Sequence, residues 1–215
     1  MNDLSDFLSS RAARLGLKIA GVVLVVAMLV AGGWLWLRTE DNRGQAALAA
    51  AADVVQQADG PTATTEARQR AIATLQLVLT QHGRSAAAAQ AAYELGNIQY
   101  QGGDYAAARG AYEIALAKGA TGTLKTLSAS GVGYTWEAQK DYPHAVTAYE
   151  STTRGLQPRQ FYFEEALLDL ARAQALAGKP AEARATYERL LKDVPESRRA
   201  QDIRARIAAL PPASK

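Results

Sequence analysis

The sequence predicts an all-α protein, with one N-terminal transmembrane helix followed by an α-solenoid of repeated helical hairpins. Three observations carry this prediction. Residues 19–37 contain no charged side chain, and three later segments align on one repeating frame. Alanine, which costs least to hold in a helix, dominates the composition. The order expected along the chain is the span, a degenerate hairpin, three regular hairpins and a terminal capping helix.

Residues 19–37 read IAGVVLVVAMLVAGGWLWL and are apolar on every face. As a helix rising 1.5 Å per residue, this segment is about 28 Å long, which matches the roughly 30 Å hydrocarbon core of a bilayer. Lys18 and Arg38 bracket it, and Trp34 and Trp36 stand near its end, where aromatic rings prefer the headgroup layer. We therefore expect a transmembrane helix that contacts membrane lipid through residues 19–37.

A cleaved signal peptide is the alternative reading of this segment. Ala31, Gly32 and Gly33 are small enough to be accepted by a signal peptidase. The apolar run is longer than the roughly 7–15 residues of a signal core. It also continues through Trp-Leu-Trp-Leu at 34–37, beyond the candidate cleavage site. An uncleaved anchor is therefore the preferred prediction.

The charges beside the apolar segment predict its orientation. Residues 1–18 form a short N-terminal segment with three Lys or Arg residues, and only Arg38 and Arg43 follow the span closely. Because the side richer in Lys and Arg faces the cytoplasm, we expect a cytoplasmic N-terminus. The chain is then a single-pass membrane protein whose solenoid faces the extracytoplasmic side. The inverted topology, with the solenoid in the cytoplasm, stays open.

Self-similarity at a regular spacing is the main signal beyond residue 38. Three segments, starting at Tyr93, Ser130 and Leu167, each contain an apolar helix, a tight turn and a second helix with Ala and Tyr four residues apart. Small residues let the two helices of a hairpin approach closely, and the tyrosine fills the gap against the next hairpin. The expected packing residues are Gly96, Ala108 and Tyr112 in the first hairpin, Gly133, Ala145 and Tyr149 in the second, and Ala171, Ala183 and Tyr187 in the third.

These positions resemble the pattern of the tetratricopeptide repeat (TPR) family. That pattern has a small residue on the first helix, a small residue early in the second helix and an aromatic residue four positions later. Pro195 also matches the proline that the family places after a second helix. The resemblance implies a TPR repeat domain over residues 64–197, in which the first helices of the hairpins line a groove for protein partners.

The residues before the three hairpins are expected to extend the stack. Residues 38–63 read as a juxtamembrane linker and a first helix over Gln45–Ala58. This helix would pair with a second one over Glu66–Gln81 across a turn at Gly60-Pro61, which forms the degenerate opening hairpin.

Residues 198–215 are expected to contribute the capping helix and the tail. The helix itself is predicted over Glu196–Leu210, with Ile203, Ile207 and Leu210 facing inward. A solenoid requires such a polar-backed end, because its last hairpin has no neighbour to cover it. The residues predicted on the solvated side are Arg198, Arg199, Arg204 and Arg206.

The TPR resemblance also implies which residues line the groove. A variant of the family clamps a partner's C-terminal carboxylate with Lys and Asn on the first helices. Here Asn97 matches and Tyr93 replaces the Lys, so no carboxylate clamp is expected. An aromatic, mildly polar groove suits unfolded or extended protein, although several of these tyrosines could instead pack between helices. The groove residues are Tyr93, Asn97, Tyr100, Tyr134, Glu137 and Arg172.

The composition argues against several other functions. The chain has no cysteine, which excludes disulfides, thiolate chemistry and a lipidated N-terminal cysteine. The net charge is only +3, with signs interleaved, whereas nucleic-acid binders concentrate positive charge on one face. His82 and His144 have no metal-ligand spacing, and Glu164-Glu165 opens a helix where the dipole favours acidic residues. We therefore expect no enzyme activity, cofactor, metal, nucleic acid or small-molecule substrate.

The layout of a short inside tail, one span and an outward TPR domain resembles the ancillary Sec-translocon subunit family of bacterial inner membranes. This resemblance implies a scaffold that links a translocation machine to periplasmic folding factors or to chaperone clients. Two alternatives remain. One is an envelope assembly factor for cytochrome maturation, pili or secretion, and the other is a permanent structural subunit of a large inner-membrane complex.

Overall fold

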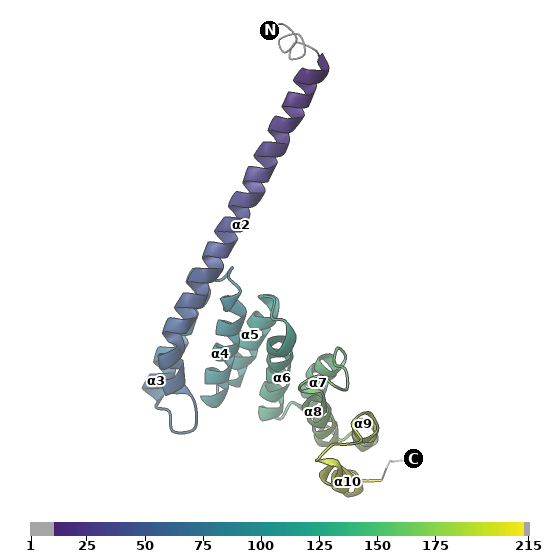
Figure 1. Ribbon diagram of the computed structural model, residues 1–215. Coiled ribbons are helices and arrows are strands. Elements are labelled where there is room, and N and C mark those ends of the chain that lie inside the picture. Colours follow the sequence, from purple (N-terminus) through teal and green to yellow (C-terminus); the bar gives the residue numbers. More distant parts are fainter. Residues whose placement is uncertain (1–10, 213–215) are drawn as a thin grey trace.

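The protein is a stack of antiparallel helices from which one long helix projects (Figure 1). The computed structural model describes residues 11–212, so that residues 1–10 of the predicted N-terminal segment and 213–215 of the tail lie outside the described residues. Within 11–212 the chain forms nine α-helices and no strand. They are α2 (Arg11–Ala58), α3 (Thr65–Gln81), α4 (Ala87–Gln101), α5 (Tyr105–Ala117), α6 (Gly122–Ala138), α7 (Tyr142–Thr153), α8 (Phe163–Leu176), α9 (Pro180–Asp193) and α10 (Ala200–Ala209).

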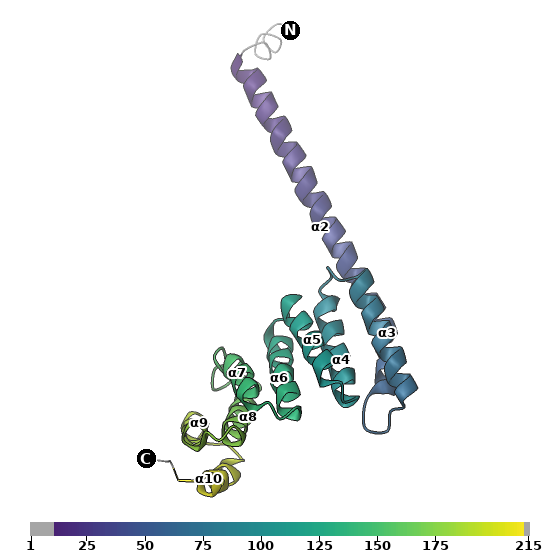
Figure 2. The ribbon, with the colours of Figure 1, turned by 180° about the vertical axis from the view of Figure 1, so that it is seen from behind.

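The long helix α2 is continuous over 48 residues. Its N-terminal half stands apart from the stack, and its C-terminal half runs along α3 (Figures 1 and 2). The large apolar side chains of the projecting half are exposed, from Leu15 at 61% to Leu37 at 50%. By length and composition, one helix in the described part of the chain, within Lys18–Ala58, could cross a membrane.

The continuity of α2 corrects one prediction. The sequence predicted a juxtamembrane linker at the start of residues 38–63, with a helix beginning at Gln45. Instead the helix runs unbroken from the apolar segment to Ala58. Residues 38–44 contain no proline, and their single glycine is held in the helix by contacts with the stack. Local sequence signals favour a linker here, and tertiary contacts override them.

Three contacts join α2 to the connection between α3 and α4. Glu40 Oε1 lies 3.1 Å from His82 Nδ1, and both side chains are more than four-fifths buried. The backbone N–H of the residue before α4 donates to Asp41 Oδ1 at 2.8 Å. Gly44 lies directly against Ser85, because a Cβ added at Gly44 would stand 2.2 Å from Ser85 Oγ. These contacts form a junction where α2 enters the stack.

Each regular hairpin turns through three residues, the second of which has a left-handed backbone. These residues are Gly103 (φ 83°), Lys140 (φ 60°) and Gly178 (φ 74°). Glycine adopts this conformation freely, whereas Lys140 bears a cost of about 1–2 kcal/mol. In the first two turns an aspartate follows, Asp104 or Asp141, whose carboxylate accepts an N–H from the next helix and caps it. The same turn chemistry therefore sets the antiparallel pairing in successive hairpins.

The nine predicted packing residues are all buried in the structure. Tyr112 lies between two glycines from neighbouring hairpins, Gly96 on α4 and Gly131 on α6. A Cβ at either glycine would stand 2.6 or 2.7 Å from the tyrosine ring. Tyr149 lies against Gly133 in the same way, at 2.3 Å. The tyrosines therefore join one hairpin to the next, as TPR-like stacking requires.

The capping helix α10 is shorter than the predicted Glu196–Leu210. Pro195 follows α9 closely, and residues 194–199 form a connection before the helix starts at Ala200. Proline has no N–H to continue a helical ladder, and the side chain of Ser197 accepts the backbone N–H of Arg199 at 3.1 Å. Ile203 is fully buried, with Ile207 and Leu210 packed against the same cluster.

Candidate protein-binding face

The first helices of successive hairpins form one face of the stack, which we call the first-helix face. It comprises the C-terminal half of α2 with α4, α6 and α8. A cavity of about 310 Å³ opens between α2 and α4, with Leu48 and Val55 on one side and Glu94 and Asn97 on the other. All six predicted groove residues belong to these helices and are half-buried. They are Tyr93, Asn97 and Tyr100 on α4, Tyr134 and Glu137 on α6, and Arg172 on α8.

On α4 the predicted groove residues contact the packing tyrosine of the same hairpin. Tyr112 donates its hydroxyl proton to Asn97 Oδ1 at 2.9 Å, and the rings of Tyr93 and Tyr112 lie 5.9 Å apart. The amide of Asn97 also reaches Glu94 at 3.5 Å. Burial raises the pKa of Glu94, and this hydrogen bond opposes the rise. Tyr93 and Asn97 thus both pack the hairpin and line the face.

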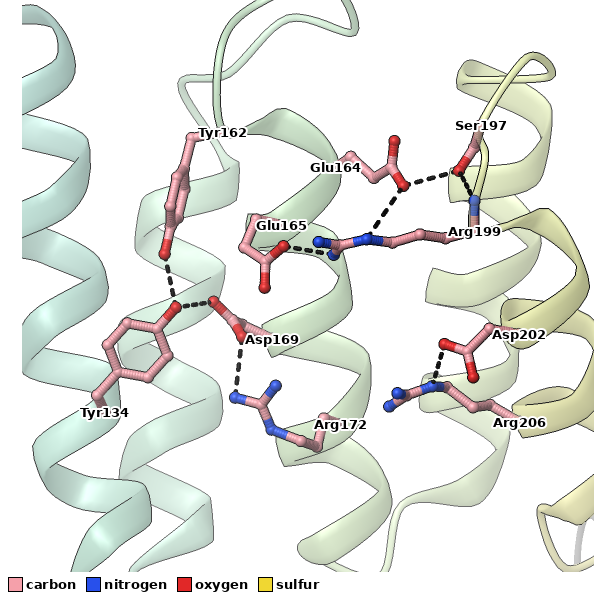
Figure 3. Close-up of polar contacts among 10 residues, drawn as sticks. All are labelled: Tyr134, Tyr162, Glu164, Glu165, Asp169, Arg172, Ser197, Arg199, Asp202 and Arg206. Atoms are coloured by element: carbon pink, nitrogen blue, oxygen red, sulfur yellow. Dashed lines mark hydrogen bonds and ion pairs between the residues drawn. The ribbon is translucent and has the colours of Figure 1, made fainter.

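A polar network centred on Arg172 joins α6 to α8, and Figure 3 shows the part of it in which Asp169 contacts Tyr134 and Arg172. The guanidinium donates to both oxygens of Glu137, at 2.8 and 3.0 Å, and lies 2.9 Å from Asp169 Oδ1. Tyr134 donates to the other Asp169 oxygen at 2.5 Å, and Tyr149 donates to Glu137 at 3.0 Å. Three of the six predicted groove residues therefore belong to one connected network.

Burial and charge keep two members of this network, Tyr134 and Arg172, protonated. Asp169 is only 1% exposed, and burial raises the pKa of its carboxyl against the lowering effect of the Tyr134 hydroxyl and Arg172. Burial, reinforced by Asp169, raises the pKa of Tyr134 far above its usual value. The hydrogen bond with Glu137 raises the pKa of Arg172. Tyr134 thus stays a donor and Arg172 a cation, which suits a fixed binding surface.

A second cluster fastens α10 to the start of α8 (Figure 3). Arg199 forms ion pairs with Glu165 and Glu164, and Ser197 donates to Glu164 at 2.7 Å. The sequence predicted a solvated Arg199 and a merely helix-stabilising acidic pair. That interpretation was incomplete, because the connection after α9 folds back over the N-terminus of α8 and brings these opposite charges together.

A cavity of about 780 Å³ lies beside this second cluster. Tyr134 and Tyr162 form part of its wall, together with Val194 and Arg199 from the far side. Phe161 stands at its rim with 76% of its surface exposed. The lining combines aromatic and aliphatic surface with a few charged groups, a composition common to ligand-binding pockets.

Sequence reasoning missed two members of the network, Asp169 and Tyr162. Asp169 carried a usable signal, since it interrupts the apolar run ALLDLARAQAL, where a buried carboxylate needs a partner. Tyr162 has no comparable signal in the sequence. Its hydroxyl lies 2.6 Å from that of Tyr134 because its backbone is left-handed, with φ 77°. A non-glycine residue in this conformation cannot be read from the sequence.

Both histidines lie at helix ends, as the sequence indicates. His82 caps α3 and contacts Glu40, while His144 follows Pro143 in the first turn of α7. The ring of His144 stacks on Trp136, with centroids 4.6 Å apart, and its Nδ1 lies 2.8 Å from Asp141. Between residues 11 and 212, no three side chains capable of ligating a metal come together.

The buried tyrosines predict a loss of stability in alkali. Burial raises the pKa of Tyr112 and Tyr149 well above 10.0, so the folded chain keeps phenolic protons that the unfolded chain releases. Their contribution is complete below pH 10 and is lost as the pH rises above it, by about 1.4 kcal/mol per pH unit for each buried tyrosine. Denaturant unfolding across this range, with tyrosinate absorbance, measures the slope. Tyr149→Phe should reduce the slope of the free energy of unfolding against pH by the contribution of one tyrosine, about 1.4 kcal/mol per pH unit. An unchanged slope would contradict the burial of the Tyr149 hydroxyl.

Comparison with known proteins agrees with this architecture. Residues 138–207 match the tetratricopeptide repeat family. Among solved structures, a Podosopora anserina protein described as a kinesin light chain with nearly identical TPR-like repeats superposes with a TM-score of 0.53 at 15% identity, covering 79% of this chain and 95% of that one. A variant of that protein gives 0.54 at 15% identity, covering 79% and 94%. No curated protein matches the chain.

These likenesses show the fold. Over the described residues the chain is all-helical with TPR-like repeats, and repeats of this kind are typical scaffolds for protein-protein interaction. Protein partners are therefore the class of ligand to which the first-helix face is suited.

Proposed function

We propose that this chain is a single-pass protein of the bacterial inner membrane, whose TPR-like solenoid captures extended segments of other proteins on the first-helix face. One observation carries the proposal. The apolar half of α2 projects from the folded domain and leaves its large side chains exposed, while the other half of the same helix is part of the domain. An anchor and a scaffold are thus one continuous element.

The exposure of residues 19–37 supports the anchor. A core helix of similar composition would be covered by other helices, whereas in this segment Val22, Leu29 and Val30 are 64–71% exposed. Burying that apolar surface in lipid is favourable by about 25 cal/mol for each Å² removed from water. At the end of the segment the guanidinium of Arg38 lies 5.0 Å from the Trp34 ring centre, a pairing suited to the headgroup layer.

The C-terminal half of α2 supports an anchor that is retained. Ala51 and Ala58 are fully buried, and Leu48 and Val55 pack against the core that α3 and α4 share. Cleavage near Gly33 would leave this buried half in the domain. It would remove most of the apolar segment, and α2 would no longer connect the domain rigidly to a membrane span. The charge tally, three Lys or Arg before the span and two just after it, favours a cytoplasmic N-terminus and a periplasmic solenoid.

The first-helix face supports a role in holding extended protein. One cavity lies between α2 and α4, and Tyr134, Glu164 and Glu165 contribute part of the wall of a second cavity near the start of α8. Tyr100 and the Arg172 network belong to the helices between them. Together with the layout of tail, span and domain, this surface suits a link between a translocation or assembly machine and its extracytoplasmic clients or folding factors. Fixed hydrogen-bonding groups bordered by apolar cavities accept varied sequences, as chaperone-like binding requires.

Site-specific photocrosslinking in intact cells tests the proposal. A photoreactive residue replaces Gln90 or Arg198, exposed positions that line the two cavities, and matched controls replace Glu113 or Thr147, exposed on the outer helices α5 and α7. We expect a ladder of heterogeneous adducts from the first pair and at least fivefold less from the controls. Equal crosslinking from all four positions would refute binding at the first-helix face.

The same experiment separates the alternatives. A single stoichiometric adduct would identify a permanent structural subunit instead of a scaffold for varied clients. A reporter fused after Lys215 tests the orientation, and activity of that reporter in the cytoplasm would overturn the periplasmic location. Retention of the chain in membranes washed with alkaline carbonate tests the anchor independently of both.

A further inference from the structure

We propose that one edge of the solenoid lies against anionic lipid headgroups, so that the domain rests on the membrane instead of standing away from it. This edge consists of the three connections between hairpins, residues 82–86, 118–121 and 154–162, and we call it the connection edge. The inference rests on the proposed anchor, because the position of the span determines which edge of the stack meets the bilayer.

The junction on α2 brings the connection edge close to the end of the apolar segment. Glu40 and Gly44, which contact His82 and Ser85 of the first connection, follow Leu37 by three and seven residues. At 1.5 Å per residue these contacts lie about 5–10 Å beyond the apolar segment along the helix axis. The headgroup layer on each side of a bilayer is roughly 5–8 Å thick. The first connection therefore begins at the depth of the headgroups.

The other two connections continue the same edge. The ammonium group of Lys118, in the second connection, donates a hydrogen bond to the carbonyl oxygen of Gly83, in the first connection, at 2.8 Å. A cavity of about 580 Å³ has Gly122, just after the second connection, on one side and Gly155 and Phe161, from the third, on the other. Both ribbon views show all three on the side of the stack from which the apolar half of α2 projects (Figures 1 and 2).

Charge distinguishes this edge from the opposite one. The three connections carry Arg84, Lys118, Arg154 and Arg159, all exposed, and no Asp or Glu. The four turns within hairpins, at the opposite edge, carry three aspartates and two lysines. The modest net charge of the chain conceals this separation. Exposed Lys and Arg close to an anionic leaflet are attracted to it within about one Debye length, roughly 8–10 Å at physiological salt.

An exposed aromatic residue adds a second observation at the same edge. Phe161 lies in the longest of the three connections, two residues after Arg159, and three-quarters of its surface is exposed. Aromatic rings beside cations are typical of the membrane interface, and Phe161 places such a ring on the same edge as the exposed arginines. An acidic protein partner would satisfy the cations, but it would not explain why they gather on the edge that faces the span.

Energy transfer in lipid nanodiscs tests the orientation with the full chain. Since the chain has no cysteine, one introduced cysteine carries the donor dye at a unique position. Gln157→Cys places it on the connection edge, and Thr62→Cys places it on the opposite edge at an equally exposed position. With acceptor dye on the headgroups of an anionic disc, we expect at least twofold higher transfer efficiency from position 157. Equal efficiency from the two positions would overturn the proposal.

Charge variants then test the cause. Adding R154Q and R159Q to the Gln157→Cys chain, or replacing the anionic lipid by a zwitterionic one, should lower the transfer efficiency by at least a third. K192Q with R204Q removes two exposed cations from α9 and α10, away from the connection edge, and should leave it unchanged. If the first pair left the transfer efficiency intact but abolished protein adducts in cells, the edge would bind a protein, and the lipid proposal would be wrong.

The design separates failure of this inference from failure of the anchor. A chain that elutes apart from the discs has no functional span, which contradicts the proposed function as well. A chain that incorporates into the discs, yet shows no difference between the two cysteine positions, retains its anchor and refutes only the lipid contact of the connection edge.

Discussion

Gly133→Ala is expected to lower the free energy of unfolding by about 3 kcal/mol, although alanine is ordinarily the better helix former. The added Cβ would stand 2.3 Å from the ring of Tyr149, which is fully buried between the second and third hairpins. Neither partner can move away, because the ring also packs against Leu170 and Ala173 of the next hairpin. Chemical denaturation followed by circular dichroism measures the loss.

Gly110→Ala is the matched control. Gly110 is also inside a helix, α5, but nothing stands within 4 Å of the position where a Cβ would be added. The same substitution there should raise the free energy of unfolding by up to about 1 kcal/mol, as expected when glycine is replaced in a helix. Changes of the same sign at Gly133 and Gly110 would contradict the close packing of Tyr149.

Arg172→Met is expected to destabilise the domain by about 2–4 kcal/mol. Methionine preserves most of the side-chain length but leaves Asp169, which is 1% exposed, without a cation, and leaves Glu137 with only the hydroxyl of Tyr149. The expected loss is somewhat less than for a fully buried pair because Arg172 is itself about one-third exposed. Thermal and denaturant unfolding measure it.

A compensating variant distinguishes uncompensated charge from lost packing. Combining Arg172→Met with Asp169→Asn removes the buried negative charge, so the double variant should recover at least half of the lost stability. Asp169→Asn alone should be milder than Arg172→Met, because Tyr134 can still donate to the amide oxygen. A double variant as unstable as the sum of its parts would show that the network is not coupled as described.

The hairpin architecture was predictable because its signals are local and repeated. Ala108 and Tyr112 recur with the same spacing at Ala145 and Tyr149, and a small residue followed by an aromatic one at a fixed interval is what close helix crossings require. The turns could also be predicted, from Gly103 and the corresponding residues Lys140 and Gly178. By contrast, nothing marked Gly131, because its role is to face a tyrosine of the preceding hairpin, outside the frame on which the repeats align.

The candidate binding face was only half predictable for a similar reason. The repeat frame indicates which positions point to the first-helix face, and so it identified Glu137 and Arg172. It does not indicate that these two, thirty-five residues apart, form a bidentate pair, or that Asp169 joins them. The predicted linker before Gln45 failed for a related reason, since contacts with the α3–α4 connection, distant in sequence, keep α2 helical.

The unbroken course of α2 has a mechanical consequence. The same helix forms the proposed span and one wall of the first-helix face, with no hinge between them. Tilting or rotating the span in the bilayer therefore tilts or rotates the first-helix face by the same angle. The direction in which the first-helix face points around the axis of α2 then depends on the number of residues between the span and the junction. One alanine inserted after Arg38, ahead of the junction at Glu40, would rotate the face by about 100° and lift it by about 1.5 Å.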